Sequence, residues 1–165
     1  MWLDPDNAAA FARAAAEALA ARDPDNAGLY RSNADAFAAE LNALETRLEA
    51  RLAASQGRPF LVFHDAYQYF ETRFGLTAAG SILLGDASSP SAARMAEARA
   101  VVADTGAACV FTEPQFSARL AAAVIEGSNA RKAMLDPLGA EVAPGPDHYV
   151  RTLEAMGDAI ADCLG

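Results

Sequence analysis

The chain has 165 residues and a formal net charge of −9 at neutral pH, and its acidic residues are spread along the whole sequence. An acidic domain without a basic cluster is a poor nucleic-acid binder, because contacts to phosphate need lysine and arginine. No apolar run reaches the roughly 18 residues of a membrane span, and no secretory signal opens the chain. We therefore expect a soluble globular domain with no transmembrane segment, either cytosolic or a mature or truncated piece of an exported protein.

The motif Asp-Pro-Asp-Asn-Ala occurs twice, at residues 4–8 and 23–27. Aspartate is favoured as a helix N-cap, proline fits the first helical position, and a further acidic residue suits the first turn. Each copy therefore predicts a helix start, the first helix running to about Ala21 and the second over about 27–54. The second helix has an apolar seam in steps of four and three, which indicates one face packed against a partner. The seam consists of Tyr30, Ala34, Phe37, Leu41, Leu44, Leu48 and Leu52.

After Gly57 the pattern changes to short apolar runs that alternate with helical stretches. The runs are 60–63, 81–84, 109–111 and 133–135, and the helical stretches are 67–74, 90–104, 117–126 and 148–164. Such alternation predicts a parallel sheet with right-handed crossovers, and near-continuous apolar strands indicate that both sheet faces are covered. We expect an α/β fold in which two long helices precede a four-stranded parallel sheet with flanking helices. No low-complexity linker divides the chain, so we expect one domain with a helical segment, 1–56, and an α/β unit, 57–165.

Polar side chains follow three of the predicted strands directly: His64 the first, Glu113 the third and Asp136 the fourth. Ligands of open parallel sheets bind outside the carboxyl ends of the strands, so these side chains are expected at one ligand-binding edge. An imidazole with carboxylates suits a divalent transition metal. Each residue also has a simpler interpretation: His64 as a packing or capping residue, Glu113 in a structural role, and Asp136 in turn chemistry before Pro137.

Other chemistries find less support in the sequence. It contains no phosphate-binding loop, no strand-linked dinucleotide fingerprint and no nucleophile elbow. The second histidine, His148, follows a Gly-Pro turn at a predicted helix start, and we interpret it as a surface residue. Cys109 and Cys163 are either two reduced buried thiols or one structural disulfide, and their spacing alone does not decide between them.

Several stretches together resemble the ZnuA family, the periplasmic zinc-binding components of bacterial zinc ABC transporters. They are "WLDPDNA", "DPDNAGLYRSNADAFAAEL", "VFHDAYQYF", "CVFTEPQF", "LDPLGAEVAPG" and "ADCLG". The resemblance covers almost the whole chain, as the C-terminal lobe of a two-lobe solute-binding protein. It implies that the protein is not an enzyme but captures Zn²⁺ in the periplasm and delivers it to a permease at the inner membrane.

The resemblance also assigns roles to residues. Family members hold zinc between two lobes, mainly through three histidines, of which His64 matches the third. Asp136 matches the place where manganese-type relatives use an aspartate ligand. Glu113 matches a family acidic residue that we place, with Asp65 and Tyr67, beside the ligands or in a structural role. The resemblance further implies a disulfide, since Cys109 and Cys163 match a cysteine pair that some relatives join.

The other two histidines and the N-terminal lobe lie outside residues 1–165, so we expect this chain to hold only half a zinc site. The first helix matches the helix between the lobes, which would leave the alanine-rich face around 8–16 uncovered. Three alternatives stay open. They are a manganese- or iron-binding relative, a small α/β metal-dependent enzyme with Asp136 and Glu113 as acid and base, and an adhesin-like interaction module.

Overall fold

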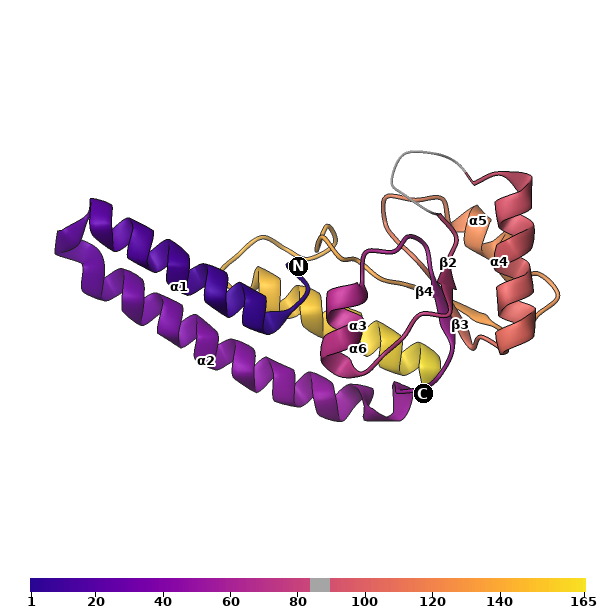
Figure 1. The fold of residues 1–165 in the computed structure, drawn as a ribbon, viewed down its shortest axis with the longest axis horizontal. Helices are drawn as coiled ribbons and strands as arrows, with labels where there is room; N and C mark the ends of the chain where they lie inside the picture. The colour runs from indigo at the N-terminus through magenta and orange to yellow at the C-terminus, as the bar shows by residue number, and fades with distance from the viewer. Residues whose placement is uncertain (84–89) are drawn as a thin grey trace. The chain divides into compact units, whose positions relative to one another are not determined.

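A computed structural model describes residues 1–83 and 90–165, which form two compact units, Met1–Ala50 and Arg51–Gly165. The first unit is a hairpin of two long helices, and the second contains a parallel sheet with helices around it (Figure 1). Within the described residues, no helix combines the length and the apolar character that crossing a membrane requires.

Helix α1, Pro5–Arg22, begins where the first Asp-Pro-Asp-Asn-Ala motif predicts it. The Asp4 carboxylate accepts hydrogen bonds from the backbone amides of Asp6, at 2.8 Å, and Asn7, at 3.2 Å. These bonds satisfy two of the amides that a helix start leaves without partners, and Pro5 has no amide to satisfy. The first motif is therefore a helix cap, as predicted.

The second motif begins a helix in a different way. Residues Pro24–Asn26 form a 3₁₀ turn, and helix α2, Ala27–Leu52, follows it. Asp23 makes no side-chain cap here, because its carboxylate accepts bonds from Asn26 Nδ2, at 2.8 Å, and the Tyr30 hydroxyl, at 2.7 Å. The motif predicts the helix start correctly, but its aspartate is used to hold side chains of the following turn.

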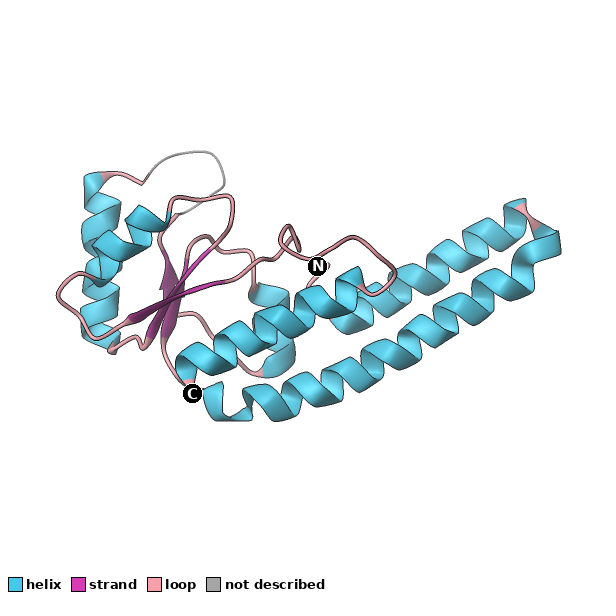
Figure 2. Cartoon of the chain, turned by 180° about the vertical axis from the view of Figure 1, so that it is seen from behind, coloured by secondary structure: helices cyan, strands magenta, loops and turns pink. Residues whose placement is uncertain are grey.

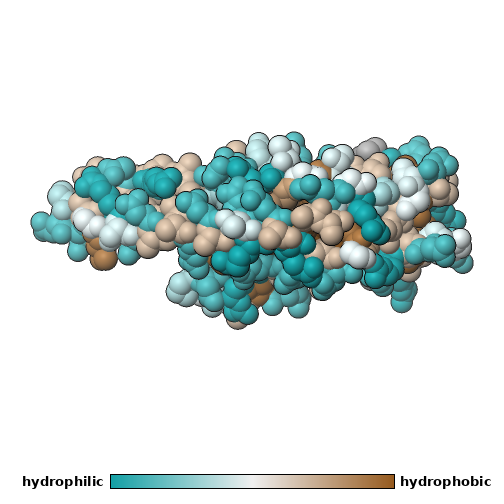
Figure 3. All heavy atoms as spheres, turned by 90° about the horizontal axis from the view of Figure 1, so that it is seen from below, coloured by the Kyte–Doolittle hydropathy of each residue, from teal (hydrophilic) through white to brown (hydrophobic). Residues whose placement is uncertain are grey.

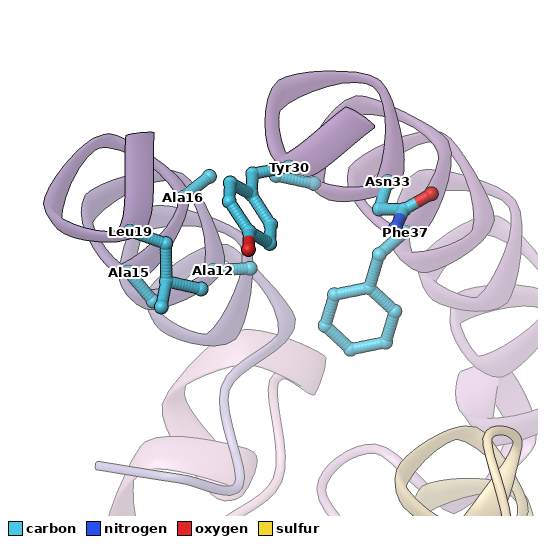
Figure 4. Close-up of a pocket in the computed structure, with 8 residues that line it drawn as sticks. Ala12, Ala15, Ala16, Leu19, Tyr30, Asn33 and Phe37 are labelled. Atoms are coloured by element: carbon cyan, nitrogen blue, oxygen red, sulfur yellow. The ribbon is translucent and has the colours of Figure 1, made fainter. Parts of the chain in front are cut away.

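Helices α1 and α2 run side by side in the hairpin unit (Figures 1 and 2). An exposed ion pair joins them, with Arg31 donating to both carboxylate oxygens of Glu17 at 2.7 and 2.8 Å. Between them lies a groove of about 310 Å³, into which Leu19, Tyr30 and Phe37 point (Figure 4). Pale-brown apolar residues also lie among hydrophilic ones on the hairpin face in Figure 3. The hairpin thus retains apolar surface, including Leu19, which is 47% exposed.

The α/β unit is built on four parallel strands in the order β2-β1-β3-β4, which confirms the predicted sheet. The strands are β1, Phe60–Val62; β2, Gly80–Ser81; β3, Cys109–Thr112; and β4, Arg131–Met134. The predicted second strand reached residue 84, which lies outside the described residues. Strands β1 and β3 are central and completely buried, as their apolar runs predict.

Helices cover both faces of this sheet (Figure 1). They are α3, Gln68–Phe74; α4, Ala92–Thr105; α5, Ala118–Ile125; and α6, His148–Leu164. Helices α4 and α5 pack on one face, and α3 and α6 lie on the other. Under α4 and α5 a buried cluster joins the strands to the helices. Its members include Leu61, Phe63, Ile82, Ala98, Val102, Val110, Ala121 and Val124.

Strand β4 differs from its prediction. The sequence pattern placed an apolar strand at 133–135, but the observed strand begins at Arg131, and Arg131, Lys132 and Met134 are exposed. Its position is set by backbone pairing with β3, from Cys109 opposite Arg131 to Thr112 opposite Met134. Because β4 is an edge strand, it does not need the apolar side chains by which the sequence pattern finds a central strand.

The disulfide implied by the family resemblance is present between Cys109 and Cys163. It ties the start of central strand β3 to the last turn of α6, and both cysteines are buried. The Arg131 guanidinium donates to the Cys163 carbonyl, which adds a polar contact between β4 and the end of α6.

Candidate metal centre

The carboxyl ends of three neighbouring strands carry the predicted site residues. His64 lies two residues beyond β1, Glu113 directly follows β3, and Asp136 lies two residues beyond β4. Because β1, β3 and β4 are parallel neighbours, their ends meet at one edge of the sheet. The three residues therefore follow strands that end at the same edge of the sheet, as predicted. Their hydrogen bonds differ from one residue to the next.

His64 and Glu113 form the closest pair at this edge. His64 Nδ1 lies 2.6 Å from Glu113 Oε1, and because a carboxylate can only accept, Nδ1 is the donor to an ionised Glu113. The His64 side chain is 15% exposed and the Glu113 side chain is fully buried. A carboxylate on Nδ1 selects the tautomer in which Nε2 carries the lone pair, and this is the arrangement that metal-binding histidines commonly show.

The Glu113 carboxylate is held on both of its oxygens. Oε1 accepts from His64, and Oε2 accepts from the Gln115 side-chain amide at 2.9 Å. Burial raises the pKa of the Glu113 carboxyl above its usual range, and the nearby His64 and Tyr67 offset part of this effect. These contacts bind Glu113 to the imidazole and to the side chain of Gln115, and its role beside a metal ligand stays a prediction.

Tyr67 borders the same group of side chains. Its ring centroid lies 6.2 Å from that of His64, and the residue is 2% exposed. Burial, and then the negative charge of Glu113, raise the pKa of the Tyr67 hydroxyl far above its usual range, and Asp136 adds a smaller effect in the same direction. The hydroxyl thus stays protonated and forms part of the wall around His64 and Glu113.

Asp136 is engaged with its own turn. One carboxylate oxygen accepts from the Leu138 amide at 3.3 Å, and the other accepts from the Glu141 amide at 2.8 Å. This is the turn chemistry that an aspartate before Pro137 favours. A carboxylate oxygen that accepts one amide hydrogen keeps a second lone pair, so a metal ligand role for Asp136 stays a prediction.

Asp65 does not share the contacts described for its neighbour His64. It lines a cavity of about 300 Å³ with Gln68, Glu71 and Ser81. Burial raises the pKa of the Glu71 carboxyl, while a bond from the Ala78 amide lowers it and the charge of Asp65 raises it further. Asp65 therefore acts electrostatically on Glu71, and its role beside the metal ligands stays a prediction.

The described residues contain no group of three or more histidine, cysteine, aspartate or glutamate side chains arranged to hold a metal ion. A metal ligand role for His64 also stays a prediction. His148, the other histidine, begins α6, and its Nδ1 lies 3.4 Å from the Ala143 carbonyl oxygen. Its imidazole packs against the turn that follows Asp136 and is half-buried.

Two contacts of this site were not singled out from the sequence. Gln115 holds the second Glu113 oxygen, and Phe116 places its ring edge-on to His64 at a centroid distance of 5.6 Å. Both follow Pro114 in a turn closed by the Phe116 amide, which donates to the Glu113 carbonyl at 3.1 Å. A proline at the second position of a four-residue turn is a usable sequence signal for this geometry.

Substituting Gly139 with alanine is expected to destabilise the turn that holds Asp136. Gly139 has φ 68°, and a Cβ there would lie 2.4 Å from Thr152 Oγ1 and 2.6 Å from His148 Nε2. We expect the left-handed backbone to cost about 1–2 kcal/mol and the steric overlap about 1–3 kcal/mol more. Urea denaturation measures the loss in the free energy of unfolding.

Gly127→Ala is the matched control for this prediction. Gly127 also has a left-handed backbone, at φ 79°, but a Cβ there would meet nothing within 4 Å. Equal losses in the two variants would show that the close approach of Gly139 to α6 adds nothing to stability.

Comparison with known proteins finds relatives along nearly the whole of this chain. The family model described as "Zinc-uptake complex component A periplasmic" matches residues 1–163. The "High-affinity zinc uptake system protein ZnuA" of Paracoccus denitrificans is 49% identical over 165 residues, which are 99% of this chain and 51% of that protein. The chain thus spans about half the length of the curated relatives it matches.

Solved structures give the same result for the fold. A crystal structure of ZnuA superposes with a TM-score of 0.86 at 30% identity, covering all of this chain and 61% of that one. The laminin-binding adhesin Lmb from Streptococcus agalactiae superposes with a TM-score of 0.86 at 26% identity, covering 99% of this chain and 62% of that one.

Proposed function

Since the chain belongs to the ZnuA family of zinc-uptake components, we propose that it serves as the zinc-holding lobe of a solute-binding protein. In this proposal the whole protein captures Zn²⁺ in the periplasm and delivers it to the permease of an ABC transporter at the inner membrane. The observation that carries the proposal is the bond of His64 to the buried Glu113 at the ligand-binding edge of the sheet.

His64 is the proposed zinc ligand, through Nε2. Glu113 holds the other ring nitrogen, at 2.6 Å, which orients the ring and raises its basicity as a ligand. Asp136 is the second, weaker candidate, since its carboxylate already accepts two backbone amides. Glu113 and Tyr67 are proposed to support His64 without contacting the ion.

The proposal includes a shared site. Zinc sites generally use three or four protein ligands, and the described residues place one imidazole and at most one carboxylate at the edge as candidate ligands. We propose that the remaining ligands come from the part of the whole protein that corresponds to the other half of its relatives. The ion would then lie between two lobes, and each lobe alone would bind it weakly.

A periplasmic location agrees with this function. The chain joins Cys109 to Cys163. Disulfides persist in oxidising compartments such as the bacterial periplasm and are rare in the cytosol. The disulfide therefore supports a protein that works outside the cytoplasm.

Metal titration of the 165-residue chain by calorimetry tests the proposal. We expect one weak zinc site per chain and still weaker binding of Mn²⁺, because imidazole prefers zinc and manganese prefers oxygen ligands. Binding of Mn²⁺ in preference to Zn²⁺ would contradict the proposal and favour the manganese- or iron-binding relative.

The enzyme alternative has less support. It needs Glu113 as an acid or base, yet Glu113 is 2% exposed and its two oxygens are held by His64 and Gln115. A general acid or base has to come within hydrogen-bonding reach of a substrate. The relatives that the chain matches are named as uptake proteins.

An interaction role is a second candidate, because the neighbour Lmb is named as a laminin-binding adhesin. A solid-phase laminin assay on this chain tests it. We expect no saturable binding, since no surface feature of the described residues favours this role over metal transport.

A further inference from the structure

Phe116 makes a contact with His64 that the zinc-site assignment above does not use. Its ring meets the imidazole edge-on, with centroids 5.6 Å apart and planes at 66°. The Glu113 bond fixes the position of Nδ1. Phe116 adds a second, apolar contact to the same imidazole.

Phe116 is itself held firmly enough to act as that second contact. Its ring stacks on Phe63, with centroids 4.5 Å apart and planes at 15°. Its amide donates to the Glu113 carbonyl at 3.1 Å, in the turn that contains Pro114. Phe63 directly precedes His64, so the stack joins the end of β1 to the loop after β3 next to the site.

We infer that Phe116 is a positioning residue for His64: its ring, stacked on Phe63, holds the imidazole so that Nε2 points toward the metal position. This inference rests on the proposed zinc function. Two groups on one short turn then act on one imidazole, since Glu113 holds its Nδ1 and the Phe116 ring meets it edge-on. The turn after β3 thereby preforms the ligand before any ion arrives.

The test is Phe116→Leu in the 165-residue chain, with Zn²⁺ titrated against the ring ¹⁵N signals of the two histidines. Leucine keeps an apolar side chain but removes the aromatic contact. The interaction free energy of an aromatic pair corresponds to a factor of roughly 3 to 10 in an equilibrium constant. We therefore expect the affinity of His64 for zinc to fall by that factor. Phe116→Tyr keeps the ring and is expected to retain the affinity of the unmodified chain.

Phe60→Leu is the matched control. This substitution also removes an aromatic contact, that of Phe60 with Phe111, whose ring centroid lies 5.6 Å away. Phe60 begins β1, whereas His64 lies beyond the other end of this strand. We expect Phe60→Leu to lower stability at least as much as Phe116→Leu while leaving zinc affinity unchanged. Equal zinc affinities in the two leucine variants would overturn the inference and leave the proposed function standing.

The His64→Ala variant separates the remaining outcomes. If His64→Ala alone leaves zinc binding unchanged, the ligand assignment fails and the inference fails with it.

Discussion

Replacing His64 with alanine is expected to remove zinc binding by this chain from the range that calorimetry can measure. His64 is the one imidazole at the ligand-binding edge of the described structure, and Asp136 already accepts two backbone amides. Loss of an outer partner of a metal ligand typically costs about 10- to 100-fold in affinity, and loss of the ligand itself costs more. Zinc titration of the variant and of the unmodified chain, under the same conditions, measures the difference.

His148→Ala is the control for this result, since it removes the other histidine of the chain. His148 packs on the turn after Asp136 and lies at the start of α6, away from the His64–Glu113 pair in the sequence. We expect this variant to keep the zinc affinity of the unmodified chain. Tight zinc binding that survives His64→Ala but not His148→Ala would move the site to the other histidine.

The sheet of this protein is largely predictable from its sequence because its central strands are apolar runs that a hydropathy pattern detects. Buried β1 and β3 are continuous apolar runs, and the helices between the runs were placed to within a few residues. Strand β4 shows where the signal fails, since Arg131 and Lys132 belong to it through backbone pairing alone. Hydropathy cannot detect a pairing register, so edge strands are placed less accurately than central ones.

The sequence predicts which residues lie at one edge of the sheet, but it does not predict the hydrogen bonds that their side chains make. Parallel topology brings the ends of β1, β3 and β4 together, which places His64 near Glu113 without any knowledge of side chains. Which nitrogen of His64 meets Glu113 depends on side-chain rotamers and on the turn after β3. The amides that hold Asp136 belong to a turn whose geometry includes a left-handed glycine. Such details arise from packing and are not encoded in residue spacing.

Reduction of the Cys109–Cys163 disulfide is expected to lower the free energy of unfolding by about 4 kcal/mol, the entropy model's value for a loop of this length. The two cysteines are separated by 54 positions in the sequence. The bond limits the conformations of the unfolded chain, and in the folded state it fastens α6 to central strand β3. Urea denaturation of the oxidised and the reduced chain measures the change.

A variant with Cys109→Ala and Cys163→Ala provides the control, since its stability should not respond to the reductant. An unfolding midpoint that is unchanged on reduction of the native chain would contradict the prediction. Zinc affinity at His64 should respond little, provided the reduced chain remains folded, because Cys109 begins β3 whereas Glu113 follows its end. The disulfide and the proposed metal site lie at opposite ends of β3, so the disulfide can stabilise this unit without setting the geometry of the proposed site.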